Sequence, residues 1–208
     1  MWNRGGRRIF DFVIALALLV LFSPILIVLA IWILLSAGPP ALFRQARGGY
    51  RGKVFEVRKF RTMLDRRDPS GKLLPDEQRL TSVGRVLRAT SLDELPTLWN
   101  VVRGEMSLVG PRPLMAKYLD LYSEEQMRRH DVLPGITGWA QVKGRNALEW
   151  EQKFAFDLWY VDHAGFRLDM KILWFTIWKT LRREGIGYGA TETMPEFTGS
   201  IPAGRKEK

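Results

Sequence analysis

The segment from Phe12 to Leu35 constrains the fold more than any other part of the chain, because it is apolar except for the pair Ser23-Pro24. About 20 apolar residues allow a helix to cross roughly 30 Å of hydrocarbon, so this segment is long enough to span a membrane. Pro24 lacks a backbone donor and clashes with the preceding turn, so we expect the helix to kink or break there. Each half then reaches only about half-way across a bilayer, at about 1.5 Å per residue. Two structures fit: a kinked span, or a re-entrant hairpin that dips into the bilayer and returns.

The charges on both sides of this segment favour the hairpin. Positive charge concentrates on the cytoplasmic side of membrane segments, so two basic flanks place both ends on that side. Lipid-exposed irregular backbone is not tolerated, and the Ser23 hydroxyl is suited to bond a carbonyl that Pro24 frees. A secretory signal peptide is excluded because the apolar part is too long and no small-residue cleavage site follows. The basic residues are Arg4, Arg7 and Arg8 before the segment, and Arg44, Arg47, Arg51 and Lys53 after it.

The composition indicates an anionic partner. The chain has 208 residues, enough for one globular domain beside the membrane element, and its 32 Lys and Arg outnumber its 22 Asp and Glu, for a net charge of +10. Lipid head groups, nucleic acid and phosphorylated substrates all suit this balance. No cysteine is present, which excludes disulfides and thiolate chemistry, and two histidines are too few for a histidine metal cluster. Hard metals bound by carboxylates remain possible.

The predicted fold class is α+β, mostly helical, with one small β-hairpin formed by residues 41–45 and 54–62 around glycine pairs. Apolar spacing predicts helices near residues 80–87 and 95–102, and Gly104 is expected to end the second. Residues 65–76 and the glycine-rich residues 134–145 are predicted to be loops. Further helices are expected at residues 115–120, 123–130, 146–162 and 168–183, the second with a capping box of Ser123 and Gln126.

The chain divides into three predicted parts: a re-entrant membrane helix-break-helix in residues 1–37, a cytoplasmic catalytic domain in residues 38–184, and a loosely ordered tail in residues 185–208. The helix at residues 168–183 carries tryptophan near basic residues, which suits an amphipathic helix at a membrane interface. A buried core helix explains the same residues equally well.

Asp93 and Glu94 are the candidate catalytic residues, because two carboxylates stand together before a helix in Ser91-Leu92-Asp93-Glu94-Leu95-Pro96. Ser91 and Glu94 also fit a capping box. In that register Pro96 would stand at the fifth helical position, where its missing donor is needed, whereas a cap at Asp93 leaves Pro96 in the first turn. Both interpretations, cap and active site, remain open from spacing alone.

The chemistry that such a pair supports is phosphoryl transfer. A carboxylate can attack phosphorus to give an acyl phosphate. A second carboxylate can share a Mg²⁺ ion that neutralises a diphosphate and polarises the attacked phosphorus. Arginines bind phosphate oxygens in forked geometry. Arg112 stands between two prolines and is therefore held well for that task.

The chain resembles the bacterial sugar transferases, also called monotopic phosphoglycosyl transferases, over nearly all of residues 7–184. Its length, without extra membrane spans, resembles the short diacetylbacillosamine-phosphate transferase type. The motifs that carry the resemblance are Arg8-Ile9-Phe10-Asp11, Phe22-Ser23-Pro24, Lys59-Phe60-Arg61-Thr62-Met63, Ser91-Leu92-Asp93-Glu94-Leu95-Pro96, Asn100, Met106-Ser107-Leu108-Val109-Gly110-Pro111-Arg112-Pro113, Pro134-Gly135-Ile136-Thr137-Gly138-Trp139-Ala140-Gln141-Val142 and Gly144-Arg145-Asn146.

The resemblance implies transfer of a sugar phosphate from a UDP-sugar, expected to be an acetamido sugar, to undecaprenyl phosphate, with release of UMP and a requirement for Mg²⁺. It implies a re-entrant helix broken at Ser23-Pro24, attached to the cytoplasmic face of the bacterial inner membrane. Asp93 would be the nucleophile in a ping-pong mechanism, forming a phosphosugar–Asp93 intermediate, and Glu94 its partner in the metal-binding dyad. Lys59, Arg88 and Arg112 would contact phosphates.

Glu105, Asp157 and Arg145 match family positions and are candidate substrate-binding residues. For Asp157, an exposed i,i+4 pair with Lys153 is an alternative. Two other functions compete with the main one. A hexose-1-phosphate transferase using UDP-glucose or UDP-galactose lies within the family. A membrane-anchored basic binding protein fits the net charge, but it lacks a nucleic-acid motif and leaves the carboxylate pair unexplained.

Overall fold

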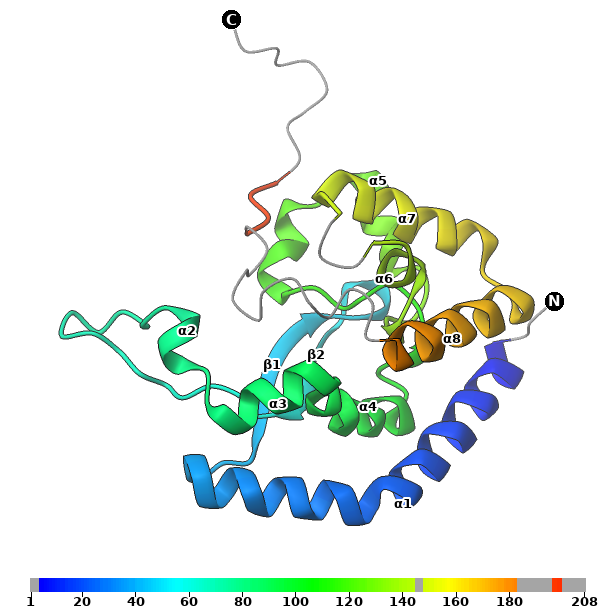
Figure 1. Cartoon of the computed structure of the whole chain (residues 1–208). Helices are drawn as coiled ribbons and strands as arrows, with labels where there is room; N and C mark the ends of the chain where they lie inside the picture. The colour runs from blue at the N-terminus through cyan, green and yellow to red at the C-terminus, as the bar shows by residue number, and fades with distance from the viewer. Residues whose placement is uncertain (1–3, 145–147, 183–195, 200–208) are drawn as a thin grey trace, which may run out of the picture.

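The computed structural model describes residues 4–144, 148–182 and 196–199, which form a mostly helical protein with two small sheets around one long apolar N-terminal helix (Figure 1). The α-helices are α1 (Arg4–Ala37), α2 (Asp76–Arg79), α3 (Ser82–Thr90), α4 (Leu98–Arg103), α5 (Glu124–Met127), α6 (Trp139–Lys143), α7 (Trp150–His163) and α8 (Phe166–Leu181). The strands are β1 (Leu42–Gly48), β2 (Val54–Phe60), β3 (Ser107–Val109) and β4 (Gly135–Thr137). The 3-10 helices are η1 (Tyr50–Gly52), η2 (Leu92–Thr97), η3 (Ala116–Leu121) and η4 (Arg128–His130).

Helix α1 bends but does not break at its proline. It is one helix of 34 residues with Pro24 inside it, and Figure 1 shows it curving along one edge of the domain. Of the two outcomes predicted at Pro24, a kink or a break, the structure has the bend, and the helix-break-helix is not present. The Ser23 hydroxyl donates to the carbonyl of Val20 at 2.8 Å. That carbonyl lies four residues before Pro24 and loses its usual partner to the proline, so the predicted rescue by Ser23 is confirmed.

Polar bonds hold the first half of α1 against the domain. Arg7 donates to the carbonyl of Val109 at 2.6 Å and to the hydroxyl of Tyr160 at 2.6 Å. Arg8 donates to the carbonyls of Val101 and Val102 at the end of α4. Asp11 accepts from the backbone N–H of Leu108 at 3.2 Å. The charged residues at this end of α1 therefore fasten it to α4, β3 and α7.

Apolar packing holds the second half. Leu29 and Ile33 of α1 are buried in a cluster with Phe60 of β2 and with Val83 and Leu87 of α3. Both halves of α1 thus lie on the same domain. The opposite face of the helix is apolar and exposed, and α1 is long and apolar enough between Gly5 and Ala37 to cross a membrane by length and composition. The large apolar side chains of α1 with the highest exposed fractions are Ile9, Val20, Leu21, Val28 and Leu35.

The predicted hairpin is confirmed. Strands β1 and β2 pair antiparallel with Leu42 opposite Phe60, and β1 extends to Gly48. Asn100 of α4 anchors the hairpin, because its side chain donates to the carbonyl of Glu56 at 2.7 Å and accepts from the N–H of Arg58 at 3.2 Å. The predicted stop of α4 is also confirmed, since Gly104 adopts the left-handed conformation with φ 80°.

The glycine-rich residues 134–145 are not a simple loop, which corrects the prediction. They hold strand β4, which pairs parallel with β3, and helix α6. The glycines allow the close approach: a Cβ on Gly135 would lie 2.1 Å from the backbone nitrogen of Gly110. The glycines suggested a loop, but in the structure they allow two backbone segments to pack closely against each other.

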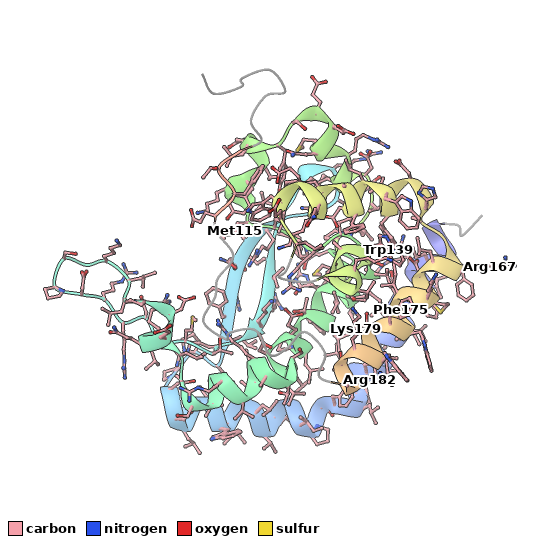
Figure 2. All side chains as sticks on the ribbon, turned by 45° about the horizontal axis from the view of Figure 1, so that its top comes forward. Met115, Trp139, Arg167, Phe175, Lys179 and Arg182 are labelled. Carbon is pink, nitrogen blue, oxygen red and sulfur yellow. The ribbon has the colours of Figure 1, made fainter. Side chains whose placement is uncertain are left out.

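Helices α7 and α8 cover the side of the domain next to the start of α1 (Figure 1). On α8, Trp174, Ile177 and Trp178 are exposed, whereas Ile172 is fully buried. Figure 2 labels Phe175, Lys179 and Arg182 along the same helix. One face of the helix thus lies in the core and an apolar face is exposed, while its place at a membrane interface stays a prediction. The predicted capping box of Ser123 and Gln126 is present, whereas residues 116–121 form a 3-10 helix instead of an α-helix.

The tail prediction lies mostly outside the described residues. Within residues 196–199, Phe197 is buried against the rings of Tyr118 and Phe154, and Glu196 pairs with Lys117 at 2.8 Å. This short segment is therefore packed against the domain.

Candidate active site

Asp93 and Glu94 lie in η2, which connects α3 to α4. Ser91 has φ 57°, in the left-handed region, and its backbone ends α3 while its side chain makes no cap bond to η2. Neither predicted cap is therefore present. The 3-10 helix accommodates Pro96, which is buried inside it. The two carboxylates are thus free of a capping role, which removes the main structural alternative for them.

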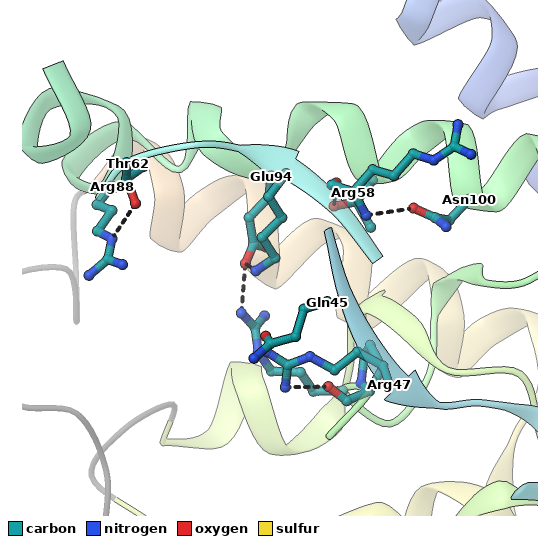
Figure 3. A network of polar contacts seen from close by, with 11 residues as sticks. Gln45, Arg47, Arg58, Thr62, Arg88, Glu94 and Asn100 are labelled. Atoms are coloured by element: carbon teal, nitrogen blue, oxygen red, sulfur yellow. Dashed lines mark hydrogen bonds and ion pairs between the residues drawn. The ribbon is translucent and has the colours of Figure 1, made fainter. Parts of the chain in front are cut away.

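Glu94 is the centre of a cluster of cations that come from distant parts of the chain. Its Oε1 atom accepts from Nζ of Lys59 on β2 at 2.5 Å and from Nη2 of Arg112 at 2.6 Å (Figure 3). Lys59 and Arg112 were both predicted phosphate contacts, and the structure brings them together on one carboxylate oxygen. A phosphate group presents oxygens of the same charge, so both cations suit a diphosphate at this position.

The electrostatics of the two carboxylates differ. Burial would raise the pKa of Glu94, but the charges and hydrogen bonds of Arg112 and Lys59 outweigh it and hold this pKa well below its usual range. The pKa of Asp93 is raised, first by burial and then by the neighbouring Glu94, with Lys59, Arg88 and Arg112 opposing the shift. Glu94 is therefore ionised at neutral pH, whereas Asp93 is a more basic carboxylate than usual.

Arg47 of β1 adds a further charge to the cluster around Glu94. No sequence pattern identified it as a site residue. Its Nη1 donates to the carbonyl of Pro113 at 3.3 Å. Burial and the repulsion of Arg112 lower its pKa to about 10. A small pocket lies between these groups, lined by Arg47, Lys59, Glu94 and Arg112 with Thr97, Met106, Pro113 and Ile136 among its other walls. This pocket is the candidate active site.

A buried ion pair positions Arg112. Arg129 of η4 binds Oδ2 of Asp157 on α7 through Nη2 at 2.6 Å and Nε at 3.2 Å, and the two side chains are only 2% and 5% exposed. The same Nη2 donates to the carbonyl of Arg112 at 2.8 Å. Asp157 therefore pairs with Arg129 and not in the proposed exposed pair with Lys153. Arg129 was missed because no sequence pattern links it to Arg112.

The remaining candidates lie at different distances from the pocket. Arg88 on α3 donates from Nε to the hydroxyl of Thr62 at 3.1 Å, and its charge acts on Asp93. Glu105 accepts from Asn100 at 2.7 Å and pairs with Arg103 at 3.1 Å, so the structure places it beside the hairpin anchor. Arg145 lies outside the described residues. Lys59, Arg88 and Arg112 therefore surround the carboxylate pair, while Glu105 does not join them.

The described residues contain no group of three or more Asp, Glu and His side chains arranged to hold a metal ion. Asp93 and Glu94 still fit Mg²⁺, which is commonly held by one or two carboxylates together with substrate phosphates. Both oxygens of Asp93 and Oε2 of Glu94 accept no hydrogen bond from a described side chain, whereas Oε1 of Glu94 is occupied by two cations. The oxygens suited to a metal are therefore those of Asp93 and the second oxygen of Glu94.

The chain belongs to the bacterial sugar transferase family, whose model matches residues 2–183. This confirms the family that the motifs indicated. Among similar proteins, the uncharacterized sugar transferase EpsL of Bacillus subtilis (strain 168) is 53% identical over 194 residues, which cover 93% of this chain and 96% of that protein.

Other relatives have names that state an activity, among them the following two. A UDP-glucose:undecaprenyl-phosphate glucose-1-phosphate transferase of Caulobacter vibrioides is 43% identical over 181 residues, which cover 82% of this chain and 68% of the relative. A UDP-galactose-lipid carrier transferase of Erwinia amylovora is 39% identical over 200 residues, which cover 88% of this chain and 42% of the relative. The chain thus spans less than half the length of the second protein.

Proposed function

We propose that this protein transfers a sugar 1-phosphate from a UDP-sugar to undecaprenyl phosphate, giving undecaprenyl-diphosphate-sugar and UMP. The observation that carries the proposal is the pocket in which Lys59 and Arg112 converge on Glu94. Asp93 is the next residue along the chain, and its side chain makes no ion pair within the described residues. The named relatives support it, because their names state this reaction class for glucose and a lipid-carrier transfer for galactose.

In the first half-reaction, a carboxylate oxygen of Asp93 attacks the β-phosphorus of the UDP-sugar. The bond from that phosphorus to the bridging oxygen breaks, UMP leaves with the bond's electrons, and a phosphosugar–Asp93 acyl phosphate forms. The raised pKa of Asp93 makes its carboxylate a better nucleophile than an ordinary aspartate. Arg112, Lys59 and Arg88 are placed to bind the phosphate oxygens as charge moves to the leaving UMP.

In the second half-reaction, an oxygen of the lipid phosphate attacks the phosphorus of the acyl phosphate. The phosphorus–oxygen bond to Asp93 breaks and the carboxylate is restored, which completes a ping-pong cycle. Glu94 holds Lys59 and Arg112 in place through its ion pairs with both cations. We propose that Asp93 and Glu94 hold Mg²⁺, which when bound would neutralise the diphosphate and polarise the attacked phosphorus.

We also propose that α1 enters a membrane and returns to the same, cytoplasmic side. Both of its halves pack on one domain, and its outer face is exposed and apolar. A straight span would take one half away from that domain. The exposed tryptophans of α8 and the net charge of +10 suit an anionic phospholipid surface next to it.

The donor sugar is the open part of this proposal, because two observations differ. The length of the chain predicted an acetamido sugar, whereas the named relatives use glucose or galactose. The name of EpsL, which aligns over 96% of its own length, does not state a donor sugar. A panel of UDP-sugars separates the two donor classes.

The test is UMP release in detergent from UDP-glucose, UDP-galactose and UDP-acetamido sugars, with Mg²⁺ and undecaprenyl phosphate. We expect release by the wild type with one donor class, and its loss without Mg²⁺ and in Asp93→Asn. Asp120→Asn makes the same change at an exposed position and should retain activity. Intact-protein mass should show a phosphosugar on the wild type when lipid is omitted. Undiminished release by Asp93→Asn would refute Asp93 as the nucleophile.

A further inference from the structure

A second, apolar groove lies on the other side of the β1–β2 hairpin from the candidate active site. It has a volume of about 360 Å³, within the range of small-molecule pockets. Helix α1 contributes Leu19, Leu26, Ile27 and Ala30, which flank the bend at Pro24. Trp99 of α4 forms another wall and is 44% exposed. This apolar surface is therefore open to a ligand, beside the part of α1 that we place in the membrane.

One short 3-10 helix joins the groove to the active site. Pro96 lines the groove, whereas Glu94 of the same helix lines the polar pocket. Asp93 and Pro96 are three residues apart, which is roughly 6 Å at a rise of about 2.0 Å per residue. A ligand whose apolar part lies in the groove thus has its end close to the proposed nucleophile.

Among the described residues that line the groove, Arg58 is the one with a charged side chain. It alternates with Lys59 along β2, and in Figure 3 it extends away from Glu94. Its Nε atom is buried and has no hydrogen-bond partner within the described part of the chain. The positive charge of its guanidinium, within an otherwise apolar lining, favours a ligand that carries an anionic group.

We propose that this groove binds the isoprenoid chain of the lipid-phosphate acceptor, with its phosphate directed past Pro96 to Asp93. This rests on the proposed function, which supplies a lipid phosphate as second substrate. An apolar chain with an anionic head matches an apolar groove with one cation better than a sugar nucleotide does. Because Pro96 lines the groove and stands three residues after Asp93, the groove suits the acceptor better than a bulk phospholipid, which has no chemistry at Asp93.

The first test compares two substitutions on α1 in the full-length protein. Ile27→Trp adds volume within the groove, and Ile31→Trp makes the same change outside its lining on a residue of similar exposure, 51% against 60%. We expect Ile27→Trp to raise the KM for undecaprenyl phosphate at least fivefold without changing phosphosugar–enzyme formation from the donor alone. Its preference for undecaprenyl phosphate over a ten-carbon isoprenyl phosphate should also shrink. Ile31→Trp should match the wild type in all three measurements.

The second test measures binding without turnover. In Asp93→Asn, an undecaprenyl phosphate with a photoreactive group in its chain should cross-link to peptides that contain residues 19–30 or Trp99. Ile27→Trp should reduce this yield at least fivefold, and Ile31→Trp should not. Because it needs no catalysis, this result holds even if the proposed reaction fails in the UMP assay.

Three results would overturn the groove assignment: equal lipid KM values in Ile27→Trp and the wild type, an equal rise in Ile31→Trp, or cross-links confined to other peptides. Competition of the cross-link by phosphatidylglycerol as effectively as by undecaprenyl phosphate would assign the groove to phospholipid and reject the acceptor.

Discussion

The two faces of the β1–β2 hairpin carry opposite chemistry. One face, with Lys59, points to Glu94 and Arg112 in a charged pocket, and the other, with Arg58 and Phe60, lines an apolar groove against α1. Strand alternation separates the two faces, and η2 joins them within a few residues. The hairpin therefore separates a charged environment, suited to the proposed reaction of a sugar nucleotide, from an apolar environment, suited to the proposed lipid chain.

The two sites are also held in different ways. The charged pocket gathers residues from β1, β2, η2 and the segment after β3, and the buried pair of Arg129 and Asp157 holds that segment in place. The groove depends on α1, whose second half is held by apolar packing. Loss of a buried charge partner should therefore affect the pocket more than any single apolar change affects the groove.

The largest effect is expected for Arg129→Met, which leaves Asp157 buried without its partner. Breaking a buried ion pair costs about 3–5 kcal/mol, so urea unfolding should show a loss of that size. The carbonyl of Arg112 also loses its donor, so kcat should fall. The double variant Arg129→Met/Asp157→Leu should recover much of the stability but not the activity. Equal stability of Arg129→Met and the wild type would contradict the role of the pair.

Lys59→Met should come next, because it removes one cation from the charged pocket. Loss of one preorganised charge contact costs roughly 10²-fold in rate, so UMP release and phosphosugar–enzyme formation should slow by about that factor. The chain-length preference for the lipid should not change, since Lys59 faces away from the groove. A change in that preference would show that the two sites are not separate.

The pH dependence should shift by a smaller amount. In the proposed mechanism Asp93 must be ionised to attack, so its raised pKa places the acidic limb of the rate profile above the ordinary aspartate value of about 3.9. Glu94→Gln removes a neighbouring negative charge, so the pKa of Asp93 and the limb should move to lower pH. Lys59→Met removes a positive charge, so the limb should move to higher pH. Phosphosugar–enzyme formation measured across pH tests both directions, and identical limbs would contradict the coupling.

The ion pairs of Glu94 should make the free energy of unfolding depend on pH, because the pKa of Glu94 is shifted in the opposite direction to that of Asp93. Its pKa in the folded protein is lowered, so its ion pairs stabilise the fold above the ordinary glutamate value of about 4.3. This stabilisation is lost as the pH falls through the folded pKa. The free energy of unfolding should therefore fall less between neutral and acidic pH in Glu94→Gln than in the wild type.

Glu105→Gln should have the smallest effect. Glu105 binds Asn100 and Arg103 and lies outside the charged pocket, so we expect a loss of about 1 kcal/mol in stability from one weakened hydrogen bond. The KM values for donor and lipid should stay unchanged. Chemical denaturation and steady-state kinetics measure both, and a tenfold drop in kcat would place Glu105 in substrate binding.

Local patterns predicted much of the fold. The apolar length of α1, the glycines around the hairpin and Gly104 after α4 each act within a few residues, and the structure has the corresponding elements. Prediction failed where the local structure depends on contacts between segments that are far apart in the sequence. Gly135 belongs to the segment predicted to be a loop, yet it lies in β4, whose parallel pairing with β3 brings its backbone against Gly110 and is specified by no local signal.

The sequence by itself determined the family and the long apolar helix with its proline, and it singled out Asp93 and Glu94 as the candidate carboxylate pair, because each depends on neighbouring residues or on a motif of fixed order. Only the tertiary structure decided that Lys59 and Arg112 share one oxygen of Glu94 and that Arg129 holds Arg112 in place. It also decided that α1 bends across the domain and leaves a groove beside Pro96. The physical reason is distance along the chain: charges and apolar surfaces separated by tens of residues interact only after packing brings them within a few ångströms.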